Sequence, residues 1–158
     1  MIDYKKLYRL FDGVTPLKKD CGVLCSARCC SGDERTGMML FPDEETALEV
    51  IESGGLKYAV CGGKCNRSER PLSCRIFPFF PAVDKDGKVS VTIDYRGFGI
   101  CPLVRNAPEI AFDTRFLRHV KAAGKILARD PECRKLMEEI TGDITDAVIM
   151  TDKLEGLK

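Results

Sequence analysis

Hydrophobic residues at helical spacing open the chain. Tyr4, Leu7, Tyr8 and Phe11 recur at intervals of three or four positions, while charged residues fill the positions between them. This is the pattern of a helix with one apolar face. The sequence therefore predicts a short amphipathic helix over residues 3–11, leading toward the first of several cysteine-rich segments.

The last third of the chain also has helical patterns. Asp113 or Thr114 is a suitable N-cap for a helix over residues 113–129, and Asp-Pro-Glu starts another over residues 130–140. The tail at residues 143–158 fits a helix and a strand equally well. The apolar side of the first of these helices consists of Phe116, Leu117, Val120 and Leu127.

Residues 42–53 have the features of a further helix. Proline stands at the start, three acids follow in the first turn, and apolar residues recur at Ala47, Leu48 and Ile51. The Gly54-Gly55 pair then favours a helix stop. The preceding segment, residues 31–40, contains two glycines and is interpreted as a loop.

Strand patterns occupy the middle of the chain. Residues 56–60 form a short apolar run, which predicts a strand. Residues 78–95 are interpreted as a β-hairpin, because Lys-Asp-Gly-Lys at 85–88 provides a turn and an alternating segment follows it. Together these elements predict a small single α+β domain over residues 1–158. The apolar positions of the alternating segment are Val89, Val91, Ile93 and Tyr95.

Composition narrows the range of functions. The chain has 158 residues, which is the size of one ordinary domain, and 44% of them are hydrophobic. Charges interrupt the N-terminal segment early and no apolar stretch is long enough to span a membrane, so we expect a cytoplasmic protein. With 25 basic and 24 acidic residues, the net charge of +1 provides no electrostatic argument for binding nucleic acid or an anionic membrane.

Cysteine is the residue type that most needs an explanation. The chain has nine cysteines, and eight of them belong to short groups or motifs. In a reducing compartment, grouped cysteines indicate metal binding or catalysis more often than disulfides, and an odd count fits poorly with full pairing. The eight candidate metal ligands are Cys21, Cys25, Cys29, Cys30, Cys61, Cys65, Cys74 and Cys101.

The spacing of these cysteines suits thiolate ligation. On a helix, Cys21, Cys25 and Cys29 would share one stripe with Cβ atoms about 5–6 Å apart, while Cys30 would point elsewhere. The eight thiols therefore suggest either two centres or one centre with accessory thiols. In the second group, two glycines between Cys61 and Cys65 allow the backbone to turn tightly. Thiolate cages accept both zinc and iron, so the spacing leaves the metal open.

Other residues near the cysteines have less specific patterns. Three arginines, at positions 67, 70 and 75, either offset thiolate charge or are solvated surface residues or partners of Glu69. Three phenylalanines, at 77, 79 and 80, are expected to form core packing and a dry wall beside the site. Cys133 is expected to be structural or partly exposed, and His119, the only histidine, an ordinary surface or interface residue. With a single histidine, the sequence provides no argument for a Ser-His-Asp or Cys-His catalytic set.

The cysteine pattern resembles that of a known family. Residues 21–30 followed by Cys61-x3-Cys65, Arg-Pro-x2-Cys-Arg-x-Phe-Pro at 70–78 and Cys101-Pro102 are similar to the YkgJ-type cysteine-cluster family. Its members are described as zinc- or iron-chelating proteins, and the flagellin lysine N-methylases belong to the same broad group. The resemblance covers residues 18–104, although the first spacing here is x3 where the family signature has x2.

The resemblance implies that the eight cysteines bind a metal. We therefore expect a metal-binding core over residues 18–104 and a mainly helical part over residues 113–158. The expected function is that of a cytoplasmic protein that holds Zn²⁺ or an iron–sulfur cluster. A lysine N-methylase-like enzyme and a thiol redox or metal-transfer protein are the alternatives.

Overall fold

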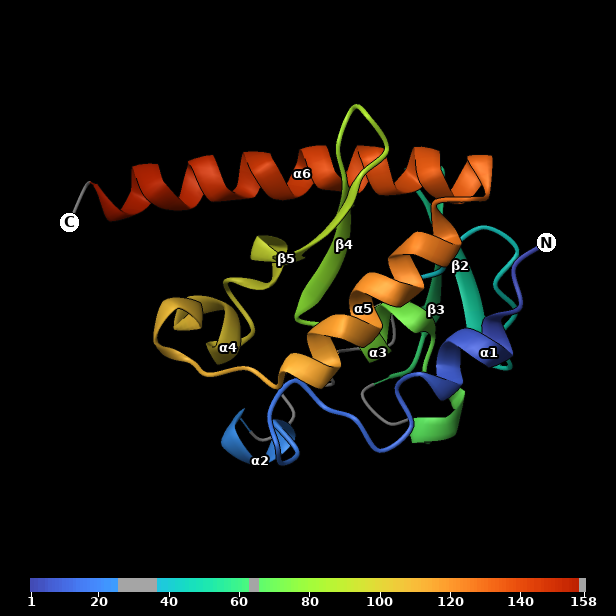
Figure 1. The fold of residues 1–158 in the computed structure, drawn as a ribbon, viewed down its shortest axis with the longest axis horizontal. Coiled ribbons are helices and arrows are strands. Elements are labelled where there is room, and N and C mark those ends of the chain that lie inside the picture. Colours follow the sequence, from blue (N-terminus) through green and yellow to red (C-terminus); the bar gives the residue numbers. More distant parts are fainter. Residues whose placement is uncertain (26–36, 63–65, 157–158) are drawn as a thin grey trace.

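Helices and two small antiparallel sheets make up the described part of the protein (Figure 1). The computed structural model describes residues 1–25, 37–62 and 66–156. The expectation of a small α+β domain is confirmed at this level. No helix in these three ranges is long and apolar enough to cross a membrane.

The first sheet has three strands in the order β1-β3-β2. These are β1 (Gly37–Met39), β2 (Glu49–Ser53) and β3 (Leu56–Val60). The strand predicted at residues 56–60 is therefore confirmed as β3. Residues 37–39, expected to be part of a loop, instead form a strand because they pair with β3 in antiparallel register.

The helix predicted over residues 42–53 is wrong. Gly54 and Gly55 have φ values of 57° and 78°, and they connect β2 to β3 as a two-residue hairpin turn rather than ending a helix. Upstream, the side chains of Glu44 and Thr46 accept hydrogen bonds from the backbone N–H groups of Phe41 and Leu48. Such local side-chain bonds compete with helix formation.

The second sheet is the hairpin predicted at residues 78–95. Its strands are β4 (Phe79–Val83), which is buried throughout, and β5 (Val89–Ile93). The Asp84 carboxylate accepts hydrogen bonds from the N–H groups of Asp86 and Lys88, and Gly87 has a φ of 79°. These contacts fix the turn between the two strands.

The three longest helices lie near the two ends of the described chain. They are α1 (Tyr4–Arg9), α5 (Thr114–Leu127) and α6 (Pro131–Glu155), capped at their N-termini by Asp3, Asp113 and Asp130. The helices predicted at 3–11 and 113–129 are confirmed. The third begins as predicted but does not end near residue 140: it continues through most of the ambiguous tail.

Several short elements connect the sheets and the longer helices. Figure 1 shows α2 and α4 on the side of the molecule where α5 begins. These elements are α2 (Gly22–Cys25), η2 (Arg67–Glu69), α3 (Leu72–Ile76), η3 (Tyr95–Gly97), α4 (Pro102–Arg105) and η4 (Ala107–Glu109).

The main hydrophobic core lies where α5 and α6 pack on the hairpin, and α1, which packs against α3, contributes residues to the same core. Gly124 makes the contact between α5 and the hairpin possible, since a Cβ atom there would lie 2.4 Å from the Cβ of Pro81. A smaller cluster forms around Cys101, Leu103 and Val104, with Cys21 and Phe77 packed against it. This second cluster brings two of the candidate ligands to one side of the fold.

Candidate functional site

Three of the eight candidate ligands line one cavity. Cys21, Cys74 and Cys101 come from segments far apart in the sequence, yet all three border a hollow of about 360 Å³. The cavity lies between α2, α3, the start of α4 and the first turn of α5, because residues of all four elements line it. The fold thus brings together three cysteine motifs that are far apart in the sequence.

Each of these cysteines has a defined local position. Cys21 directly precedes α2, where the Asp20 carboxylate accepts a hydrogen bond of 2.9 Å from the N–H of Gly22. Cys74 lies in α3, and its N–H donates to the carbonyl of Pro71. Cys101 is the N-cap residue of α4 and is 7% exposed. The proline that follows Cys101 takes the first helical position, which suits its fixed φ.

The wall of the cavity is largely apolar. Phe77 lines it, and the neighbouring Gly97 allows the close approach of this ring, since a Cβ at position 97 would lie 2.8 Å from Cζ of Phe77. Phe79 and Phe80 are buried in the main core instead. The other apolar residues of the wall include Phe11, Val14, Pro78, Leu103 and Phe116.

The polar part of the cavity is mainly cationic, although Asp20 also lines it. Arg67, Arg70 and Arg75 all line it. Arg67 forms an ion pair with Asp20, and the side chains of both residues are exposed. An acidic and a basic side chain therefore lie beside Cys21, on the cavity rim.

Arg75 is held inside the fold. Its Nε donates to the carbonyl of Arg70 at 2.7 Å and its Nη2 to the carbonyl of Ser68 at 2.9 Å, while the guanidinium carbon lies 4.4 Å from the centroid of the Tyr8 ring. Only 10% of its side chain is exposed, and its Nη1 lies 3.9 Å from a carboxylate oxygen of the exposed Asp12. The interpretation as a solvated surface residue is therefore wrong for Arg75, which contributes a fixed positive charge beside Cys74.

The structure describes the side chain of one further candidate ligand, Cys61. Cys25 is the last residue of α2, but its side chain lies outside the described part, as do Cys29, Cys30 and Cys65. The predicted helical stripe through residue 29 is therefore described only over Gly22–Cys25. Cys61 follows β3, is half-buried and does not line the cavity.

The described residues do not by themselves complete a ligand set. Within residues 1–25, 37–62 and 66–156, no three His, Cys, Asp or Glu side chains are grouped closely enough to hold a metal ion. Cys21, Cys74 and Cys101 share the cavity without meeting at a common point. A complete thiolate site would need further ligands.

Cys133 lies elsewhere and is structural. It is fully buried, and its Sγ is 3.6 Å from the hydroxyl oxygen of Tyr4 in α1. Burial raises the pKa of this thiol to about 11. His119 also has a packing role, since its Nδ1 is hydrogen-bonded to the carbonyl of Leu10 and its ring meets Phe11 edge-on.

Sequence patterns did not identify Glu44, a buried carboxylate near the site. It is 7% exposed, and burial raises its pKa above the ordinary value. Its oxygens accept hydrogen bonds from the hydroxyl of Tyr8 and from the N–H groups of Phe41 and Leu72. In the sequence it stands among three consecutive acids of an expected helix, so no signal separated it from its neighbours.

No family model, curated protein or solved structure matches this chain.

Proposed function

We propose that this protein binds a metal centre, either Zn²⁺ or an iron–sulfur cluster, through cysteine thiolates. The observation that carries the proposal is the shared cavity of Cys21, Cys74 and Cys101. Single buried cysteines are common, but three from separate motifs around one hollow need a chemical reason. The further candidate ligands are Cys25, Cys29, Cys30, Cys61 and Cys65.

The charges around the cavity support this function. A divalent ion bound by four thiolates has a net charge of −2, and such a charge is stabilised by nearby cations. Three arginines, at positions 67, 70 and 75, outnumber the acid Asp20 in the cavity lining, and Arg75 is fixed there by hydrogen bonds to backbone carbonyls. The apolar wall limits access of water, which favours a stable thiolate centre.

The resemblance to the YkgJ-type family also supports the proposal. In a reducing cytoplasm, where we place this protein, thiols are available as ligands rather than oxidised to disulfides. The two segments Cys21–Cys30 and Cys61–Cys65 each contain further thiols that would complete the set. The centre would join these segments to α3 and α4, and would stabilise the fold to that extent.

Anaerobic purification followed by metal and sulfide analysis tests the proposal. Iron with acid-labile sulfide and a brown colour would identify a cluster, whereas zinc in a colourless protein would identify a Zn²⁺ site. We expect Cys74→Ser and Cys101→Ser to lower the bound metal per chain, and Cys133→Ala to retain it. A protein without zinc or iron, or full metal content in both serine variants, would contradict metal binding at this cavity.

An enzyme related to the lysine N-methylases is a second candidate. The observation in its favour is the size of the cavity, about 360 Å³ with an apolar wall, which lies in the range of pockets for small ligands. An assay with an isotopically labelled methyl donor and a lysine-rich protein substrate tests this candidate. No methyl transfer by protein with its metal intact would exclude it.

A further inference from the structure

One face of α5 contains only positive charges. Arg115, Arg118, Lys121 and Lys125 are exposed along the helix, and Arg129 is exposed in the turn that follows. No acidic residue occurs between Thr114 and Arg129. We call these five residues the basic face of α5.

Helix geometry places the five cations together. At 100° per residue they fall within an arc of about 120°, on the side opposite the buried residues of the helix. Neighbouring cations are three or four positions apart, which corresponds to a rise of about 4.5–6 Å along the axis. The buried side consists of Phe116, Val120, Ala123, Gly124 and Leu127.

These cations have no acidic partners within the described ranges. None of the five forms an ion pair there, although exposed helix faces commonly mix both signs at spacings of three or four. The two acids that flank the helix are engaged elsewhere: Asp113 caps α5, and Asp130 accepts hydrogen bonds from the first turn of α6. The face is therefore an uncompensated strip of positive charge.

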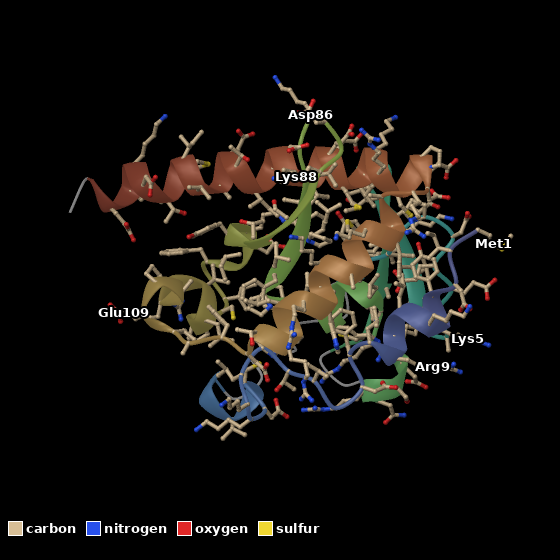
Figure 2. All side chains as sticks on the ribbon, in the orientation of Figure 1. Met1, Lys5, Arg9, Asp86, Lys88 and Glu109 are labelled. Atoms are coloured by element: carbon tan, nitrogen blue, oxygen red, sulfur yellow. The ribbon has the colours of Figure 1, made fainter. Side chains whose placement is uncertain are left out.

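The hairpin turn extends this strip into a groove. Gly87, Lys88 and Val89 face the C-terminal half of α5 across a hollow of about 400 Å³, which Lys121, Lys125 and Arg129 also line. Lys88 thus adds a cation from a second element, and Figure 2 labels it on the hairpin. The Asp84 carboxylate in the same turn is occupied by hydrogen bonds from backbone N–H groups.

The overall net charge of +1 conceals this feature. α6 alone has seven acidic and three basic residues, and these acids balance the cations of α5 in the total. The expectation that the protein has no electrostatic basis for binding nucleic acid followed from the net charge of the whole chain. The net charge does not describe how charge is distributed locally.

The residue types on the basic face of α5 favour one class of anionic partner over the others. Protein interfaces depend on aromatic anchors, and membrane-binding helices insert Trp, Phe or Leu. The chain has no tryptophan, and Ile126, 37% exposed, is the large apolar residue that α5 exposes. The face therefore offers charge at regular spacing with little apolar area, which suits a phosphate backbone.

We propose that the basic face of α5, together with Lys88, binds the phosphate backbone of a nucleic acid without reading its base sequence. The groove shows no aromatic side chain on which bases could stack, since its lining residues are aliphatic, glycine or cationic. The contacts would be phosphate contacts from lysine and arginine, which position a nucleic acid but carry no sequence information. This inference does not rest on the metal centre.

Fluorescence anisotropy with the full chain, purified anaerobically, tests the proposal. The probes are a labelled single-stranded DNA, an RNA of the same mixed sequence and the corresponding DNA duplex, titrated at several salt concentrations. With three to five phosphate contacts, we expect log K to fall against log salt with a slope of about −2 to −4.5. Comparison of the three probes shows whether RNA, single-stranded DNA or duplex is the preferred source of phosphates.

A pair of double variants provides the decisive comparison. Lys121→Gln with Lys125→Gln removes two cations of the groove, and should make the slope shallower by about 1.4 to 1.8. Lys57→Gln with Lys153→Gln removes the same charge from exposed positions on β3 and α6, and should leave the slope unchanged. Replacing Lys121 and Lys125 by arginine should retain the affinity, since arginine also contacts phosphate.

Several results would overturn the proposal. One is the absence of salt-dependent binding to all three probes. Another is an equal loss of affinity in the two glutamine pairs, because binding would then reflect net charge. Tighter binding to phosphatidylserine vesicles or to polyglutamate would assign the face to a membrane or an acidic protein instead. Thermal unfolding of each variant by circular dichroism confirms that the changes leave the fold intact.

Discussion

The carboxylate of Glu44 accepts a hydrogen bond 2.6 Å long from the backbone N–H of Leu72, at the first residue of α3. The same oxygen accepts a bond from the Tyr8 hydroxyl, and the other oxygen accepts one from the N–H of Phe41. One buried side chain therefore joins α1, the segment after β1 and α3. Since α3 contains Cys74, Glu44 fixes the position of a candidate ligand that it does not touch.

Replacing Glu44 by glutamine should destabilise the protein. The amide NH₂ would face at least one of the three donors that the carboxylate satisfies, and an unsatisfied buried donor costs about 1–3 kcal/mol in the free energy of unfolding. Urea unfolding measures this loss. Glu45→Gln is the matched control, because Glu45 is exposed and should change stability by less than about 0.5 kcal/mol. Equal stability of the two variants would contradict a structural role for Glu44.

The same residue should affect how stability depends on pH. Burial raises the pKa of Glu44 above its ordinary value of 4.5, so the folded protein keeps a proton that the unfolded chain has already lost. The stabilising contribution of the protonated Glu44 to the free energy of unfolding is fully present below pH 4.5. It is lost as the pH rises through the folded pKa.

Comparison with the glutamine variant isolates this contribution. The free energy of unfolding of the wild type, minus that of Glu44→Gln, should decrease as the pH rises from 4.5. Urea titrations of both proteins over a series of pH values measure this difference, in which the contributions of other groups largely cancel. A difference that increases with pH would contradict the direction of the pKa shift.

Sequence periodicity predicted the elements that are amphipathic on their own. The hairpin of β4 and β5 and the helix α5 follow directly from alternating and helical patterns. The expected helix at 42–53 failed because Gly54-Gly55 is a strong signal for both a helix stop and a two-residue hairpin turn. β2 is exposed at four of its five positions, so no buried stripe was available to distinguish a strand from a helix.

The candidate site was predictable in residue type but not in arrangement. The motifs around Cys74 and Cys101 identified them as candidates, and both line the cavity with Cys21. Tertiary packing decided which motifs meet: α3 is held by Glu44, and α4 starts at Cys101, within a second hydrophobic cluster. The spacing of Cys61 fits ligation equally well, yet Cys61 does not line this cavity, which no local pattern indicates.

Gly124 and Gly142 should respond in opposite ways to substitution by alanine. Both lie inside long helices, where alanine is favoured over glycine by about 1 kcal/mol. At Gly142 no atom lies within 4 Å of the added Cβ, so Gly142→Ala should stabilise the protein by up to that amount. At Gly124 the Cβ would lie 2.4 Å from Pro81 and 2.9 Å from Val89, and this clash should outweigh the helix preference.

Thermal or urea unfolding of the two alanine variants checks this contrast. We expect Gly124→Ala to lose about 1–3 kcal/mol, as overpacked cores do, because α5 must move away from the hairpin. Stabilisation at position 124 would mean that α5 and β4 are not packed as closely as the structure shows.

Cys133 should be the least reactive thiol that the structure describes. It is fully buried, and its pKa is raised to about 11, so the thiolate fraction at pH 8 is about 100-fold below that of an ordinary thiol with a pKa of 9.0. Alkylation by iodoacetamide, followed by mass spectrometry of the peptide, measures its labelling rate. We expect slow labelling in the folded protein and rapid labelling in urea.

A chelator distinguishes burial from metal protection at this thiol. Under the proposed function, removing a bound metal should speed the labelling of the candidate ligand Cys74, because a coordinated thiolate is shielded from alkylation. Cys133 should stay protected, provided the helices around it remain folded, because its shielding comes from α1 and the core rather than from a metal. Rapid labelling of Cys133 before urea is added would show that α6 does not pack against Tyr4 as described.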